Sequence, residues 1–185
     1  MTEQGDANDL RLDGLHERHP GLTQALGQSY TEAASVCLSR HHQPPVTVSL
    51  RHAGNDERRV VSFAVPDARV RNAHANETDA TEAGAYAVSL AAVEAVVGLV
   101  AVGRAETLTG ADWYVARDGT EIEDLESCIR LEVSGINAGT SGDVRRRLVE
   151  KVAQAARGKS NLPAMAAVVG FKVLEVAIYP LGEQG

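Results

Sequence analysis

The sequence predicts an α/β domain in which a small mixed β-sheet is flanked by helices and preceded by one helix and a β-hairpin. Three observations favour this class. Short runs rich in β-branched residues recur along the 185 residues, and stretches of helical length separate them. No repeat of roughly 20 to 50 residues is visible. The composition, with 44% hydrophobic and 23% charged residues, is that of one folded domain with a sizeable core.

The first 77 residues divide into a tail and a structured segment. Residues 1–20 are polar, and we expect them to be disordered or frayed. Residues 21–77 are expected to form a helix and a hairpin that pack on the core. The apolar spacing over residues 22–41 suits an amphipathic helix, and Pro44 and Pro45 end it.

The hairpin is predicted from two runs that are rich in valine. Residues 46–52 and 57–65 have the composition of strands, and residues 53–56 between them are typical of a turn. Pro66 ends the second strand, because proline cannot donate to a sheet ladder.

Residues 78–185 are expected to form the core of the fold. Residues 81–97 are apolar almost all round, which indicates a helix that is buried on most sides. The elements that follow are predicted in the order strand, strand, strand, helix, strand, strand, at residues 99–104, 112–116, 129–134, 143–157, 164–171 and 173–179.

Charge, cysteine content and hydropathy disfavour a DNA-coating protein, a zinc or disulfide protein and a membrane protein. The formal net charge of −7 disfavours a non-specific DNA-coating protein, although it is compatible with a nuclease that has an acidic metal site. Cys37 and Cys128 make no zinc spacing and indicate no disulfide. The polar N-terminus has no signal pattern, and Ser89 and Glu94 interrupt the longest apolar stretch, residues 83–102. We therefore expect a cytoplasmic protein without a membrane span.

Two carboxylates stand where strands could bring them together. Asp112 opens one predicted strand and Glu132 lies within the next, so neighbouring strands can place both at one edge. Glu132 and Ser134 are two apart on a strand and therefore share a face. Converging carboxylates are hard oxygen ligands that suit Mg²⁺ or Mn²⁺ in phosphodiester cleavage.

These residues resemble the core of the PD-(D/E)XK nucleases, which has an acid on the first helix, an Asp starting the second strand and Glu-x-Lys on the third. The resemblance covers residues 78–180 and rests on Glu82, Gly110-Ala111-Asp112-Trp113-Tyr114 and Leu131-Glu132-Val133-Ser134. It implies a restriction-endonuclease-like core and a Mg²⁺ or Mn²⁺ cofactor. Glu82 would be the helix acid, with Asp112 and Glu132 as the metal ligands.

The sequence departs from this family at Ser134, where the pattern has lysine. A serine hydroxyl can hydrogen-bond a water molecule but carries no charge. Some members of the group carry the cation on the following helix, where this chain has Arg147, Lys151 and Gln154 on one flank. We expect Lys151 to be the substitute cation.

Each of these residues also has a purely structural interpretation. Glu82 could complete a capping box with Asp79, and Asp112 could bind turn amides. Glu132 could pair with Arg130, two residues earlier on its strand. The basic run at residues 145–147 could be a solvated helix face.

Three functions follow as alternatives. The first is a degenerate nuclease-like domain that is non-cleaving or conditionally active and acts as a binding or assembly subunit, in bacterial defence or DNA processing. The second is an active Mg²⁺- or Mn²⁺-dependent nuclease, and the third is a structural interaction module. Nucleic acid would bind the helix at residues 145–151. A protein partner or second copy would bind the N-terminal helix and hairpin through Val46, Val48, Val60, Val61 and Phe63.

Overall fold

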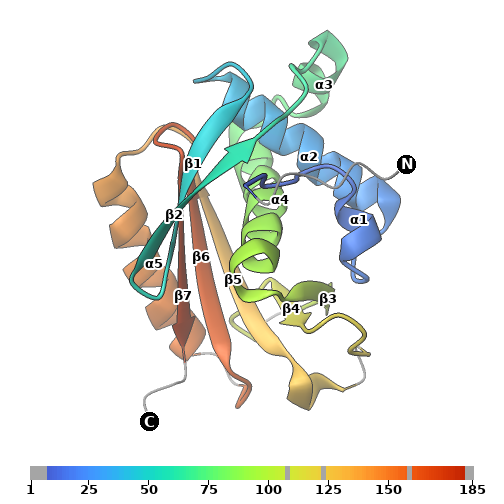
Figure 1. Ribbon diagram of the computed structural model, residues 1–185, viewed down its shortest axis with the longest axis vertical. Coiled ribbons are helices and arrows are strands. Elements are labelled where there is room, and N and C mark those ends of the chain that lie inside the picture. The colour runs from blue at the N-terminus through green and yellow to red at the C-terminus, as the bar shows by residue number, and fades with distance from the viewer. Residues whose placement is uncertain (1–7, 107–108, 122–123, 158–159, 182–185) are drawn as a thin grey trace.

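A computed structural model describes residues 8–106, 109–121, 124–157 and 160–181. Its centre is a seven-stranded mixed sheet in the order β2-β1-β7-β6-β5-β4-β3 (Figure 1). The strands are β1 (Val46–His52), β2 (Asn55–Val61), β3 (Val100–Arg104), β4 (Trp113–Ala116), β5 (Ile129–Ile136), β6 (Ala164–Gly170) and β7 (Glu175–Leu181). The predicted α/β class is therefore confirmed.

Helices cover both faces of this sheet. Helices α2 (Gln24–Ser39) and α4 (Glu77–Val97) pack together on one face, and α5 (Ser141–Ala156) lies on the other (Figure 1). Three short helical segments complete the fold: α1 (Leu15–Arg18), α3 (Ala68–Ala73) and a 3₁₀ turn at Leu125–Ser127. The sequence prediction did not include these three, because each is shorter than two helical turns.

The strand directions place β5 in the middle of the second half of the sheet. Strands β3, β4 and β5 pair antiparallel in sequence order, whereas β6 runs parallel to β5. A parallel pair needs a crossover connection, and α5 supplies it. The N-terminal hairpin joins the same sheet because β1 pairs parallel with β7.

Helix α4 is the central helix of the core. Its N-cap is Asn76, whose side chain accepts from the amides of Thr78 and Asp79, and Gly98 ends it with a φ of 71°. Glu82 therefore lies inside the helix, and the capping-box interpretation of this residue is wrong. The helix has the length and hydropathy of a membrane span, but 67% of its most apolar window is buried within the chain.

Small residues allow α4 to approach α2 closely. A side chain at Gly84 would place its Cβ atom 2.9 Å from the Cα and N atoms of Ala34, a distance that real Cβ contacts do not show. The two helices therefore pack backbone against backbone at this point. This contact fixes the position of the first turns of α4, which carry Glu82.

The expectation of a disordered tail is wrong for residues 8–20, while residues 1–7 lie outside the described part of the chain. Leu10, Leu12 and Leu15 are at most 2% exposed. The Leu10 amide donates to the Val60 carbonyl at 2.8 Å, which pairs the segment with β2. Each of these leucines is buried although polar residues separate them. The average polarity of the segment therefore gave the wrong prediction.

Three of the four valines proposed as a partner-binding face belong to the core of this chain, whereas Val60 is half-buried. Val46, Val48 and Val61 are between 1% and 7% exposed, and Phe63 packs against the same cluster. The outer strand β2 ends at Val61 instead of residue 65, and its first four residues are polar and exposed. Charged side chains on an edge strand discourage pairing with another chain.

Candidate functional site

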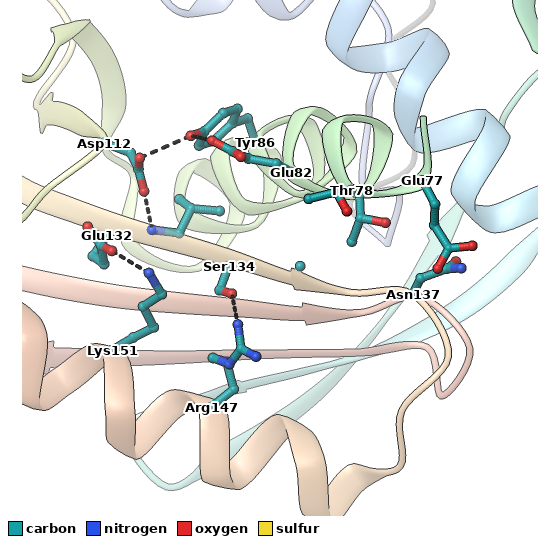
Figure 2. A pocket seen from close by; sticks show the side chains of 13 residues that line it. Glu77, Thr78, Glu82, Tyr86, Asp112, Glu132, Ser134, Asn137, Arg147 and Lys151 are labelled. Carbon is teal, nitrogen blue, oxygen red and sulfur yellow. Dashed lines mark hydrogen bonds and ion pairs between the residues drawn. The ribbon is translucent and has the colours of Figure 1, made fainter. Parts of the chain in front are cut away.

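A cleft of about 430 Å³ lies where α4, β5 and α5 meet (Figure 2). All five residues singled out from the sequence line it: Glu82, Asp112, Glu132, Ser134 and Lys151. Glu82 comes from α4, while Lys151 and its neighbour Arg147 come from α5 on the opposite wall (Figure 2). The fold thus brings together side chains that lie up to 69 residues apart, from 82 to 151, in the chain.

Asp112 is fixed by the sheet itself. Its amide donates to the Leu131 carbonyl at 2.8 Å, and its Oδ2 accepts from the Val133 amide at 2.8 Å. The carboxylate thus takes the place of a main-chain carbonyl in the ladder between β4 and β5. The structural interpretation was partly right, since Asp112 binds an amide, but that amide belongs to the neighbouring strand.

Glu132 is a buried carboxylate paired with two groups of α5. Only 4% of the residue is exposed, and its Oε1 accepts from Lys151 Nζ at 2.6 Å and from Gln154 Nε2 at 2.8 Å. Burial raises the pKa of Glu132, and the nearby Asp112 and Glu82 carboxylates add to this rise, which Lys151 opposes without cancelling it.

Arg130 is not the partner of Glu132, so that interpretation is wrong. Its guanidinium group donates to the carbonyls of Thr109, Ala155 and Leu162. These bonds tie the end of α5 and the segment before β6 to the sheet. Arg130 points to the same face as Glu132 but reaches away from the cleft, toward main-chain oxygens.

Tyr86, which was not identified from the sequence, links Glu82 to Asp112. Its hydroxyl lies 2.7 Å from Glu82 Oε1 and 3.0 Å from Asp112 Oδ1 (Figure 2). Arg104 Nη2 donates to the same hydroxyl oxygen at 3.1 Å. Burial and the Asp112 carboxylate raise the pKa of Tyr86 well above its usual value, so the hydroxyl keeps its proton. Spacing was the available signal, because Tyr86 follows Glu82 by one helical turn.

The centre of the cleft is occupied by Ser134 and Arg147. Arg147 Nη1 donates to Ser134 Oγ at 3.2 Å, and its Nε lies 3.2 Å from Glu150 Oε2. The other two arginines of the basic run point elsewhere: Arg146 pairs with Asp143 on its own helix, and Arg145 lines a different cleft. One of the three arginines therefore faces the site.

The donor set fits a divalent cation only in an open arrangement. Within the described ranges, no three Asp, Glu, His or Cys side chains are grouped so that they could hold a metal ion. Mg²⁺, however, is usually held by one or two carboxylates together with water and substrate phosphates. Asp112 and Glu132 could supply such a pair, because each carboxylate oxygen has two lone pairs and the bonds above leave acceptor capacity.

Comparison with known proteins gives no relative. No protein-family model, no curated protein and no solved structure matches this chain.

Proposed function

We propose that this chain is a divalent-metal-dependent phosphodiesterase that acts on nucleic acid. The observation that carries the proposal is the position of Lys151. Its ammonium group lies in the same cleft as Glu82, Asp112 and Glu132, 2.6 Å from Glu132 Oε1. A cation from α5 could therefore perform the role of the lysine that Ser134 replaces.

The arrangement of elements supports this proposal. From α4 onward the order is helix, three antiparallel strands, helix and a parallel strand. The acids stand on the first helix, directly before the second strand and within the third strand. This is the placement that the resemblance to the PD-(D/E)XK nucleases implies.

The roles follow from the charges along the two walls. Asp112 and Glu132 would hold Mg²⁺ or Mn²⁺, which when bound polarises a phosphoryl oxygen and acidifies water. Lys151 binds Glu132 and lines the same cleft, so its positive charge could neutralise part of the charge of a phosphate bound there. Arg147 would hold a neighbouring phosphate oxygen through its planar guanidinium group.

A second function, binding without cleavage, is favoured by one contact. Lys151 and Gln154 both donate to Glu132 Oε1, so a cation that approaches this oxygen must compete with them. The domain would then be a degenerate nuclease that serves as a cytoplasmic binding or assembly subunit, in bacterial defence or DNA processing. A purely structural role has less support, because the raised pKa of Glu132 means that burying its charge is unfavourable.

The test combines metal binding with cleavage. Mn²⁺ is titrated calorimetrically into the wild type and into Asp112→Ala/Glu132→Ala, and plasmid nicking is measured with Mg²⁺, Mn²⁺ and chelator. Loss of both signals in the double variant, but not in Glu57→Gln on the exposed hairpin, is the expected result. Metal and DNA binding without nicking would favour the second function. A folded wild type that binds neither metal nor DNA would rule out both.

Lys151 has a test of its own. We expect Lys151→Ala to lower the nicking rate by roughly 100-fold or more, because the site loses one of its two positive charges near the proposed phosphate. Lys172→Ala removes an exposed lysine in the turn between β6 and β7 and serves as the matched control. Equal rates for the two variants would remove Lys151 from the mechanism.

A further inference from the structure

Three oxygen atoms in the cleft share one proton in an arrangement that the resemblance does not explain. The Tyr86 hydroxyl stands between Glu82 Oε1 at 2.7 Å and Asp112 Oδ1 at 3.0 Å. A phenolic hydroxyl has one hydrogen and can fully satisfy one acceptor at a time. Without it, the Glu82 and Asp112 carboxylates, which come from different elements, would lose this shared donor.

The hydroxyl is held in this position by its surroundings. Tyr86 is 4% exposed, and its ring packs against those of Tyr30 and Trp113 at centroid distances of 5.3 and 6.1 Å. The Arg104 guanidinium lies 4.5 Å from the centroid of the Tyr86 ring and 4.9 Å from that of Trp113. Packing and stacking together leave the Tyr86 side chain little freedom to turn away.

Arg104 also sets the direction of the hydroxyl proton. Its Nη2 donates to the Tyr86 oxygen at 3.1 Å, so the oxygen acts as acceptor on that side. The single hydrogen must therefore point toward the carboxylates. An oxygen that accepts a charged hydrogen bond is also a stronger donor, because hydrogen bonds in a chain polarise one another.

We infer that Tyr86, oriented by Arg104, is a positioning residue that holds the carboxylate of Asp112, a proposed metal ligand, in place against Glu82. This inference rests on the proposed function. The single hydroxyl hydrogen uses one lone pair of the carboxylate oxygen that accepts it, so Asp112 keeps acceptor capacity for a cation. It acts through the acids and has no contact with the phosphate in this role.

The inference predicts the behaviour of Tyr86→Phe, which keeps the ring and removes only the hydroxyl. Calorimetric affinity for Mn²⁺ should fall by about 10- to 100-fold, the usual effect of removing a hydrogen-bond partner from a metal-binding side chain. Tyr30→Phe is the matched control, because Tyr30 belongs to the same ring cluster, and in the described part of the chain no hydrogen bond joins its hydroxyl to either carboxylate. Its Mn²⁺ affinity should be unchanged. An unchanged or tighter affinity in Tyr86→Phe would overturn the positioning role.

A second measurement separates this inference from the proposed function. Thermal unfolding without metal is recorded for Tyr86→Phe, Asp112→Asn and the double variant. If the hydroxyl holds the carboxylate, the two shifts in melting temperature are non-additive, whereas independent roles give additive shifts. A wild type that binds no Mn²⁺ would refute the proposed metal site, and additive shifts would refute the positioning contact, whichever result the metal titration gives.

Discussion

Two glutamates of this chain are paired with cations, yet their pKa values shift in opposite directions. Glu94, near the end of α4, lies between Arg18 and His19, with Arg18 Nε 2.9 and 3.0 Å from its two oxygens and His19 Nε2 at 3.2 Å. Burial would raise the pKa of Glu94, but the hydrogen bonds from His19 and Arg18 outweigh it and lower the pKa. The pKa of Glu132 is raised despite Lys151.

The two pKa values shift in opposite directions because the two side chains differ in solvent exposure and in the charges of their neighbours. The Glu94 side chain is 27% exposed and meets two basic side chains, whereas that of Glu132 is 5% exposed and shares its cleft with two other carboxylates. Folding therefore favours the charged form of Glu94 and opposes the charged form of Glu132. An acid in a cleft whose charged form is disfavoured by burial and by like charges is typical of a functional site. An acid whose charged form is stabilised by basic partners is typical of a structural ion pair.

The largest expected effect concerns His19, the fully buried member of the Glu94 cluster. Its Nδ1 accepts from the Ala101 amide at 2.9 Å, and its Nε2 faces Glu94. His19→Ala leaves a cavity and an unpaired amide, so we expect a loss of about 2–4 kcal/mol in urea unfolding. His52→Ala on the hairpin should stay within about 0.5 kcal/mol of the wild type. Similar losses for the two variants would contradict a structural role of the cluster.

Glu94→Gln should have the next largest effect. It removes the charge that Arg18 and His19 face but keeps the shape of the side chain. Because the cluster is partly exposed, we expect a loss of about 1–2 kcal/mol at pH 7. If the variant were as stable as the wild type in urea, the charge of Glu94 would make no net contribution to the free energy of unfolding.

Glu132→Gln should change stability in the opposite direction. The amide removes a buried charge whose ionised form folding disfavours, while Lys151 can still donate to the amide oxygen. We expect the variant to be equal to the wild type or more stable by up to about 1 kcal/mol, although it loses the proposed nicking activity. A clear loss of stability in Glu132→Gln would make the two glutamates equivalent and remove the contrast.

The smallest effects should appear in the pH dependence of these two variants. Glu94 has a lowered pKa, so its stabilisation is present above the unfolded value of about 4.3 and is lost as pH falls through its folded pKa. Glu132 has a raised pKa, so its unfavourable charge is present above its folded pKa and disappears as pH falls toward about 4.3. In acid, the free energy of unfolding of each variant should therefore approach that of the wild type. Glu94→Gln should approach it from below and Glu132→Gln from above. Unfolding curves between about pH 8 and pH 2 would test this convergence.

The sequence was sufficient for the features that depend on local pattern. Alternation and β-branched runs predicted all seven strands, and the strand positions of Asp112 and Glu132 predicted that both acids would meet. Lys151 was reached by helical spacing from Arg147. Strand positions and helical spacing can be recognised from the order of residues alone, without knowledge of how the elements pack.

Long-range partners could not be predicted in this way. Arg18 and Glu94 are 76 residues apart, and Tyr86 and Asp112 are 26 residues apart, on elements with no shared pattern. The buried leucines of the N-terminal segment were missed for the same reason, because their sites exist only once β2 and α4 are in place. Arg130 was assigned to Glu132 because they share a strand face, but three carbonyls offered it better acceptors.

Two different structural layers contribute to the cleft, since the acids belong to the sheet and α4, while Lys151 and Arg147 belong to α5. Only Val144 and Ala155 of α5 are fully buried, so this helix has a smaller apolar anchor than α4. Segments with few buried contacts open before the rest of a fold. Separation of α5 from the sheet would leave the three acids without Lys151 and Arg147. The charge balance of the cleft is therefore coupled to the docking of a single helix, and any partner that loosens or clamps α5 would control the site without touching it.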